Sequence, residues 1–453
     1  MPLFIRKLRL DGFLSFPPGS EPIELGALNV IIGPNGSGKS NILHSIDLLH
    51  CCAGGKAFRE KLHSGGGAAH WIWKGSDTAT IDVELGACRK KEHLPEKHTF
   101  GPEDSHDWDN QTARNMGLRE GISDFSDRLL GGCSNTIRYG VTFSANPKGT
   151  ASILEESLES LGISANGSLH ALWRRNGDVN EISTARDGTT MSRSYKLGET
   201  ERRAIADETC ILSEILRQML LAESVPSWYA SLNDVIVSGS GTLAAFLAMM
   251  LGHSNWRFGA DSVPRMAHKA DEHTLFLQDE ARNLAAMVQK IKESGQTDEL
   301  YASLRLFLPR FEELSTRKVE DKIELYLHEQ GVSEPIHAAH LSDGTLRFIA
   351  LLVLLHKPEA SLIWIEEPEL GLHPDAMHIL GNVLVQASQC KQIIVTTHSD
   401  ALLSAIDDPD CVLVCNHLGG TVVRRLDKRE LKLWVDEYRV GDLWRMGLLG
   451  GNP

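Results

Sequence analysis

Residues 33–40, GPNGSGKS, restrict the fold of this chain more than any other segment of its sequence. They fit the pattern G-x-x-x-x-G-K-[ST], follow the apolar run LNVII, and precede NILHSIDLLH, whose apolar residues recur at helical spacing. A strand, a glycine-rich turn and a helix in this order form a loop whose backbone surrounds phosphate groups at the start of the helix. The sequence therefore predicts an α/β fold that binds a nucleoside triphosphate.

The residue types in this loop explain how it would hold phosphate. Gly33, Gly36 and Gly38 permit backbone angles that turn several N–H groups toward one point, at the positive end of the following helix. Lys39 is expected to reach the β and γ phosphates, and Ser40 to offer its hydroxyl to Mg2+. ATP and Mg2+ are therefore the predicted ligands. The predicted contact residues are Gly33, Asn35, Gly36, Ser37, Gly38, Lys39 and Ser40.

Two adjacent glutamates end a second apolar run, SLIWIEE, at residues 361–367. An ATPase with a phosphate-binding loop needs a carboxylate at the end of a buried strand to hold Mg2+, and a second group to orient the attacking water. Glu366 is the metal-side candidate and Glu367 the candidate general base; the alternative is that both merely end a strand before the turn at Pro368. Glu369 lies beyond that proline, so a capping or subunit-contact role is expected and no catalytic role is assigned.

Two further segments carry polar residues where a nucleotide site would use them. The segment LSDGTLRF, residues 341–348, opens an apolar helix with Ser, Gly and Thr, and the N–H groups of a helix start favour an anion. Because the first loop already provides such a helix start, this one is predicted to face the γ phosphate bound by another subunit. The segment KQIIVTTHSDALL, residues 391–403, predicts a strand that ends near His398, where open α/β sheets place their ligand chemistry.

The order GPNGSGKS, LSDGTLR, IEEPELGLHP and TTHS resembles the Walker A, signature, Walker B with D-loop, and H-loop motifs of ABC-type ATPases. The likeness is to their RecF/SMC/OLD-like branch, and within it to a bacterial family of AAA-type ATPases that carry LSDGTLR and EEPE and occur in antiphage defence systems. It covers residues 1 to about 50 and about 270 to 453 closely. The resemblance implies an ABC-type (RecF/SMC-like) α/β P-loop ATPase head with a helical insertion.

The resemblance also implies a role for each matching residue. Lys39 and Ser40 would bind phosphate and Mg2+, with Glu366 in the metal position. Glu367 would polarise the attacking water, and His398 would sense the γ phosphate. The signature residues, which would close over the ATP of a partner subunit, are Ser342, Asp343, Gly344 and Thr345.

Three departures from the ABC pattern stand out. Asp343 and Thr345 replace the glycine and glutamine of transporter-type signatures, which changes the register of γ-phosphate contacts. Glu366 replaces the more common aspartate and is one methylene longer, so both direct and water-mediated metal contact are open. No glutamine after the first helix matches a Q-loop.

The pattern along the chain predicts a head divided by an insertion. The first residues alternate as a strand, and ELGALNVIIG follows as a second strand. Strands are also expected at TATIDVELGA, NTIRYGVTFSA and SLHALWRRNG, around a polar loop HLPEKHTFGPEDSHDWDNQ. Helical spacing marks residues 200–225 and 267–320. The predicted parts are 1–195 and 326–453 for the two portions of the head, and 196–325 for a mostly helical insertion or arm.

Composition limits the partners and the location. The formal net charge of -14 argues against attraction of DNA over the whole surface, but it leaves room for a local basic groove. The longest apolar runs fall far short of the ~20 residues of a membrane helix. The N-terminal residues lack the apolar core of a secretory signal, so we expect no membrane contact and a cytoplasmic protein. The eight cysteines show no CxxC pair, and a zinc site is not expected.

Three functions of different classes fit these observations. The first is an ATPase that acts as sensor, regulator or scaffold of a bacterial antiphage defence system and controls a nuclease or toxin effector supplied by a partner protein. The alternative is a RecF/SMC-like DNA-repair or chromosome-maintenance ATPase that clamps DNA itself. The third, a transporter subunit, does not suit the long insertion. Each would work as a homodimer or a higher homo-oligomer through composite ATP sites.

A nuclease activity of this chain is not expected. OLD proteins, which the head resembles, join it to a Toprim nuclease. Only about 55 residues follow His398 here, and they hold no glutamate followed by a D-x-D pair on strands. The acids at residues 366, 367 and 369 are already explained by the ATP site. We therefore predict no nuclease domain in this chain.

Overall fold

The computed structural model forms two compact units that interleave along the chain. One comprises residues 1–25, 41–251 and 417–422, and the other residues 26–40, 252–416 and 423–453. Neither follows the predicted three-part division, which stays a prediction. The structure describes residues 3–53, 56–87, 136–145, 151–164, 167–176, 179–186, 189–196, 253–257, 268–269, 277, 281–320, 322–356, 362–429, 431, 434 and 437–450.

An antiparallel sheet of eight strands organises the first unit, in the order β2-β1-β4-β5-β6-β7-β8-β9. The strands expected around residues 78–87, 135–145 and 168–177 are confirmed as β4, β5 and β7. Helix α2 contacts this sheet at β5, where Phe58 packs edge-on against Phe143 with ring centroids 5.8 Å apart. The bounds are β1 Leu3–Asp11, β2 Ile23–Glu24, β4 Thr78–Ala87, β5 Thr136–Ala145, β6 Ala151–Ser164, β7 Gly167–Asn176, β8 Val179–Arg186, β9 Thr189–Lys196, α2 Lys56–Ser64 and η1 Ala68–Trp71.

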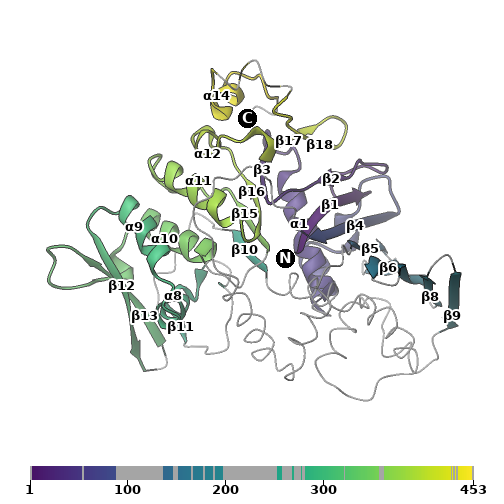
Figure 1. Ribbon diagram of the computed structural model, residues 1–453, viewed down its shortest axis with the longest axis horizontal. Helices are drawn as coiled ribbons and strands as arrows, with labels where there is room; N and C mark the ends of the chain where they lie inside the picture. The colour runs from purple at the N-terminus through teal and green to yellow at the C-terminus, as the bar shows by residue number, and fades with distance from the viewer. Residues whose placement is uncertain are drawn as a thin grey trace. The chain divides into compact units, whose positions relative to one another are not determined.

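The second unit is built on a six-stranded sheet, in the order β10-β15-β16-β3-β17-β18 (Figure 1). Strands β10, β15, β16, β3 and β17 run parallel, so their carboxyl ends lie along one edge. This arrangement confirms the predicted α/β fold. The bounds are β3 Leu28–Ile32, β10 His253–Arg257, β15 Leu362–Glu366, β16 Gln392–Thr396, β17 Val412–His417, β18 Thr421–Arg425, α10 Asp343–His356, α11 Ala376–Ala387, α12 Asp400–Ile406, η4 Pro409–Cys411 and α14 Val440–Arg445. Helix α1, Lys39–Ala53, begins in this unit, and its residues from 41 onward belong to the first unit.

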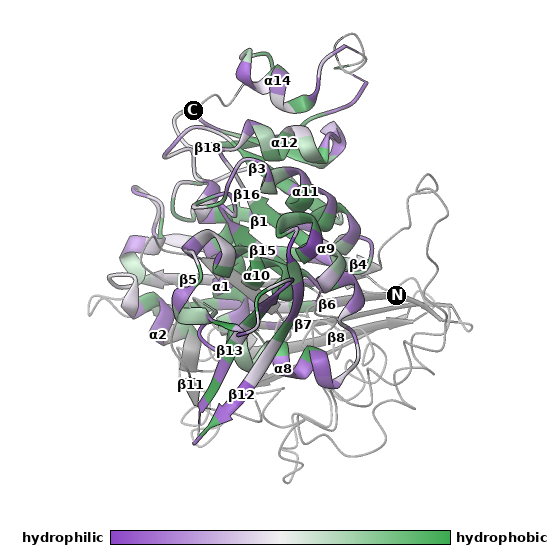
Figure 2. Cartoon of the chain, turned by 90° about the vertical axis from the view of Figure 1, so that its left-hand side faces the viewer, coloured by the Kyte–Doolittle hydropathy of each residue, from purple (hydrophilic) through white to green (hydrophobic). Residues whose placement is uncertain are grey.

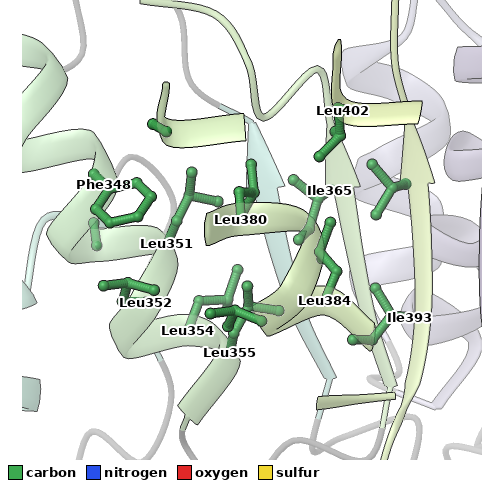
Figure 3. Packing of buried hydrophobic residues seen from close by; sticks show 14 of the residues in the cluster. Phe348, Leu351, Leu352, Leu354, Leu355, Ile365, Leu380, Leu384, Ile393 and Leu402 are labelled. Carbon is green, nitrogen blue, oxygen red and sulfur yellow. The ribbon is translucent and has the colours of Figure 1, made fainter. Parts of the chain in front are cut away.

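The core of this unit lies between the parallel sheet and the helices α10, α11 and α12. Leu351 and Leu355 of α10 lie in one cluster with Leu380 and Leu384 of α11 and with Ile365 of β15 (Figure 3). Figure 2 colours α10, β15 and β16 mainly as hydrophobic. Each fully buried aliphatic side chain stabilises the fold by about 1.5–3 kcal/mol, so the sheet edge that carries the polar residues rests on a rigid base.

The segment ELGALNVIIG is not one strand, as its sequence predicted. Ile23–Glu24 belongs to the antiparallel sheet, and Leu28–Ile32 to the parallel sheet. The buried side chain of Asn29 closes the turn between them: its Oδ1 accepts from the backbone N of Gly26, and its Nδ2 donates to the Gly26 carbonyl, both at 2.8 Å. These bonds supply the partners that a continuous ladder would otherwise provide.

Residues 281–340 add two helices and a small sheet to the second unit. The helical prediction for residues 267–320 holds over α8 and α9 but is wrong for two strands, β11 and β12. Strand β12 pairs with β13 along its whole length and buries Phe311 and Leu314. The other predicted helical range, 200–225, and the polar loop at 93–111 lie outside the described residues. The bounds are α8 Leu284–Glu293, α9 Asp298–Phe307, β11 His268–Lys269, β12 Phe311–Val319, β13 Lys322–Glu329, β14 Ile336–His337 and η3 Ala338–His340.

Within the described part of the chain, no helix combines the length and the apolar character needed to cross a bilayer.

Candidate active site

The glycine-rich loop joins the end of β3 to the start of α1, as the sequence predicted. Gly33, Gly36 and Gly38 have φ values of 154°, 75° and 102°. Ordinary side chains rarely adopt these angles, and the three glycines turn the backbone between strand and helix. Asn35 and Gly36 are exposed at the tip of the loop, whereas Ser37 is buried beneath it.

Lys39 is folded back onto its own loop. Its Nζ donates to the carbonyl oxygens of Gly33 at 2.8 Å and Pro34 at 3.0 Å, and only 7% of the residue is exposed. Burial lowers the pKa of Lys39, while the thiol of Cys415 and nearby glutamates act in the opposite direction. The loop thus holds a largely dehydrated ammonium group beside acidic residues.

Ser40 and Glu366 meet although they come from distant segments. The Ser40 hydroxyl, in the first turn of α1, donates to Oε1 of Glu366, the last residue of β15. A hydroxyl and a carboxylate oxygen are ligands that Mg2+ prefers, and this ion commonly takes one or two carboxylates together with phosphate and water. No group of three His, Cys, Asp or Glu residues suited to a metal occurs among the described residues. The hydroxyl of Ser40 and the carboxylate of Glu366 fit Mg2+ as oxygen ligands.

Glu367 and His398 face each other at the ends of two neighbouring strands. Glu367 has a left-handed φ of 45°, and its backbone N donates to the Thr396 carbonyl of β16 at 2.9 Å. Its Oε1 lies 3.6 Å from Nε2 of His398. Burial lowers the pKa of His398, the charge of Lys39 lowers it further, and Glu367 opposes both. The imidazole is consequently biased toward its neutral form.

The signature residues form the start of α10. Ser342 caps the helix, because its Oγ accepts from the backbone N of Thr345 at 3.1 Å and lies 2.8 Å from the Thr345 hydroxyl. Ser342 and Asp343 are exposed, as a surface that meets another molecule requires.

Behind this exposed start, the signature segment packs against the D-loop of the same chain. A Cβ on Gly344 would lie 2.8 Å from the Gly371 carbonyl oxygen, so only glycine permits this approach. Arg347 is buried and donates from Nη1 to the Leu370 carbonyl at 2.9 Å. The signature and the D-loop are thereby joined within one subunit.

Two residues at the site received no catalytic or nucleotide-binding role from the sequence. Glu369 accepts hydrogen bonds from the Thr397 hydroxyl at 2.8 Å and the His398 backbone N at 2.7 Å. The available signal was its position one residue beyond Pro368, which turns the chain back toward the sheet edge. Cys415 of β17 donates its thiol to the Ser37 carbonyl at 3.3 Å, and burial raises its pKa to about 11. This thiol therefore stays protonated and supports the loop from below.

Two family models and one curated protein match parts of this chain. A family model described as "AAA domain, putative AbiEii toxin, Type IV TA system" matches residues 175–404, and another, "AAA domain", matches residues 7–168. The Old nuclease of Escherichia phage P2 is 40% identical over 115 residues, which are 22% of this chain and 20% of that protein. The chain thus matches about a fifth of the length of this curated relative. These matches confirm the likeness to AAA-type and OLD-like ATPases.

Solved structures of SMC heads are also similar to this chain. The SmcHead bound to the C-winged helix domain of ScpA has 16% sequence identity and a TM-score of 0.45, and the match covers 95% of this chain and 99% of that one. The SMC head domain from Thermotoga maritima has 16% identity and a TM-score of 0.37, with 94% and 100% covered.

Proposed function

The chain belongs to the AAA-domain family whose model matches residues 175–404, and from this premise we propose that it binds ATP with Mg2+ and hydrolyses it to ADP and phosphate. One observation carries the proposal. At the carboxyl ends of β15 and β16, Glu366 contacts Ser40 of the phosphate-binding loop while Glu367 faces His398. The proposed metal ligand and the proposed general base are thus adjacent residues beside the proposed phosphate-binding loop, and phosphoryl transfer to water uses such a set of groups.

Each side chain has a distinct task in this proposal. Lys39 exchanges its two carbonyl partners for oxygens of the β and γ phosphates. Ser40 and Glu366 would hold Mg2+, and the bound ion would neutralise charge on the phosphates. Glu367 orients the attacking water and accepts its proton, and the neutral His398 can donate an N–H to the γ phosphate.

A second copy of the chain would complete the site. The exposed start of α10, with Ser342 and Asp343, supplies backbone N–H groups at the positive end of a helix. In the proposed assembly these groups contact the γ phosphate held by the partner subunit. A homodimer or a higher homo-oligomer would therefore be the hydrolysing species.

The cellular role we propose is control of an effector in bacterial antiphage defence. The description of the family names a toxin of a toxin–antitoxin system, and the curated relative is a phage nuclease. In this proposal the chain works in the cytoplasm as sensor, regulator or scaffold, and a partner protein supplies the nuclease or toxin activity.

Phosphate release by the purified chain tests the enzymatic part. We expect release that needs Mg2+, stops on addition of EDTA, and rises more steeply than linearly with protein concentration as subunits associate. Hydrolysis that is absent under all of these conditions, with and without co-purified partners, would refute the proposed activity.

Purification of the chain together with the products of its neighbouring genes tests the cellular part. A stoichiometric partner with nuclease or toxin activity supports control of an effector. Retention of DNA in an ATP- and salt-dependent manner, without a protein partner, would instead favour the alternative of an ATPase that clamps DNA itself.

A further inference from the structure

Glu369 connects the two strand ends that carry the proposed catalytic residues. It follows β15 by three positions, in a turn where the Leu370 backbone N donates to the Glu367 carbonyl at 3.1 Å. From this turn its side chain reaches the residues after β16. One oxygen, Oε1, accepts both the Thr397 hydroxyl and the backbone N–H of His398.

We propose that Glu369 is a positioning residue for ATP hydrolysis: its carboxylate fixes the backbone of His398 and thereby sets the distance between the imidazole and Glu367. This inference rests on the proposed ATPase function. It assigns no contact with nucleotide or metal to Glu369, whose effect passes entirely through the turn at residues 397–399.

The hydrogen bonds around Thr397 show why the turn depends on this carboxylate. The Thr397 hydroxyl donates to Glu369 and also accepts from the backbone N of Ser399 at 3.0 Å. The Ser399 hydroxyl in turn caps α12 by accepting from the Leu402 backbone N at 3.1 Å. Glu369 thus stands at the head of a chain of hydrogen bonds that runs through the His398 segment into the next helix.

Strand pairing alone does not hold the His398 backbone N–H. The Thr397 backbone N donates to the Ile31 carbonyl of β3 at 3.1 Å, which extends the parallel ladder by one residue. The next N–H along the chain, that of His398, is bonded to the Glu369 side chain instead. Loss of the Glu369 side chain would therefore leave the strand pairing of β16 intact but would free the backbone N–H of His398.

The role calls for a hydrogen-bond acceptor rather than for a negative charge. Both donors bond to Oε1, while Oε2 is enclosed and has no hydrogen-bond partner among the described residues. Burial raises the pKa of Glu369, and its hydrogen bonds act against this effect. A glutamine side chain, with one carbonyl oxygen of similar reach, can accept the same two bonds.

Steady-state hydrolysis of Mg2+–ATP by three variants tests the proposal. We expect E369A to lower kcat about tenfold or more while KM and the affinity for a non-hydrolysable ATP analogue change by about twofold at most. E369Q should keep most of the wild-type kcat. The third variant, T397V, removes one of the two donors and should fall between them.

Amide hydrogen exchange gives a second readout that does not depend on hydrolysis. The backbone N–H of His398 should lose protection in E369A and keep it in E369Q, while the neighbouring N–H of Thr397, bonded to Ile31, stays protected in both. Different protection of the His398 and Thr397 N–H groups distinguishes local loss of the His398 hydrogen bond from unfolding of the whole sheet. It also keeps the proposal testable if E369A is too unstable for kinetics, since T397V and E369Q retain the acceptor.

The outcomes are distinguishable. If the wild type hydrolyses ATP and E369A has the same kcat, the positioning role of Glu369 is wrong, while the proposed ATPase function stands. Equal losses in E369A and E369Q would show that the charge, not the acceptor, is needed, and would also overturn it. A wild-type protein that hydrolyses no ATP would refute the proposed function and this inference with it.

Discussion

The hydroxyl of Ser40 donates a hydrogen bond to the carboxylate of Glu366, although 326 positions of sequence separate the two residues. The contact exists because the glycine-rich loop leads from the end of β3 into α1, while β15 ends two strands away in the same parallel sheet. Parallel strands bring their carboxyl ends to one edge, so residues that are remote in the chain become neighbours there.

Removal of the Ser40 hydroxyl should impair the use of Mg2+. For S40A we expect ATP hydrolysis to fall by about tenfold or more and the Mg2+ concentration for half-maximal rate to rise, because one oxygen ligand is lost. Phosphate release across a Mg2+ titration measures both effects. S45A is the matched control: Ser45 lies in the same helix, and its hydroxyl donates only to the Ile42 carbonyl. Equal behaviour of the two variants would contradict the role of Ser40.

Glu367→Gln should separate binding from hydrolysis. The amide cannot accept a proton, yet the phosphate cradle is unchanged, so the variant should bind ATP with nearly native affinity and hydrolyse it very slowly. Measurement of ATP affinity and of the rate of phosphate release on the same preparation tests this expectation. A native hydrolysis rate in this variant would contradict the assignment of the base.

Lys39→Ala should weaken binding itself. The ammonium is the loop's cation for the β and γ phosphates, and its loss should lower ATP affinity by about tenfold or more. Isothermal titration with a non-hydrolysable analogue measures the affinity. K7A serves as the control, because Lys7 lies on β1, outside the glycine-rich loop. Its side chain is 48% exposed, and its Nζ lies 4.0 Å from Oε1 of Glu24. Normal affinity in the Lys39 variant would exclude the cradle role.

Gly344→Ala tests the contact between signature and D-loop. The added methyl group would lie 2.8 Å from the Gly371 carbonyl oxygen, so the start of α10 must shift. We expect ATP binding to survive and hydrolysis to drop, since the displaced segment no longer fits the partner's nucleotide. G26A is the control, because a Cβ there meets its nearest atom at 3.8 Å. Unchanged turnover in G344A would show that the close approach is dispensable.

Acid should destabilise the fold through His356. Burial lowers the pKa of this histidine from its ordinary value of 6.5, although the bond to the Leu352 carbonyl opposes the shift. The unfolded chain then binds the proton more readily, so the contribution of His356 to the free energy of unfolding is greatest above pH ~6.5 and falls as the pH drops toward 5.

Urea unfolding at several pH values tests this expectation in the wild type and H356Q. The variant should show a weaker pH dependence, while a residual slope from His398, whose pKa is lowered in the same direction, remains. Equal slopes in the two proteins would rule out His356 as the source.

Short sequence motifs predicted the positions of the elements at the candidate site more completely than they predicted the rest of the fold. The loop at residues 33–40, the strand ending at Glu366 and the strand ending near His398 all occur where the sequence placed them. Each is defined by a run of neighbouring residues: glycines with a lysine, or an apolar strand with polar residues after it. The roles assigned to these residues remain predictions, and so does the division into three parts.

What the sequence missed depends on contacts between distant segments. The break between β2 and β3 follows from the bonds of Asn29 to Gly26, and an asparagine inside an apolar run carries no local sign of them. The strand β12 has enough apolar residues to suit a helix, and only pairing with β13 decides otherwise. Likewise, Glu369 gained its role only when the end of β16 was brought beside it.

The hydrogen bonds of Lys39 to its own loop have a thermodynamic consequence. Because the ammonium already rests on the carbonyl oxygens of Gly33 and Pro34 inside the protein, most of its water is lost when the chain folds. When nucleotide binds, the already dehydrated ammonium group exchanges its carbonyl acceptors for phosphate oxygens. The free energy needed to dehydrate the ammonium group therefore lowers the stability of the fold. The ATP affinity then depends only on how much more strongly the phosphate oxygens bind the ammonium than the two carbonyl oxygens do.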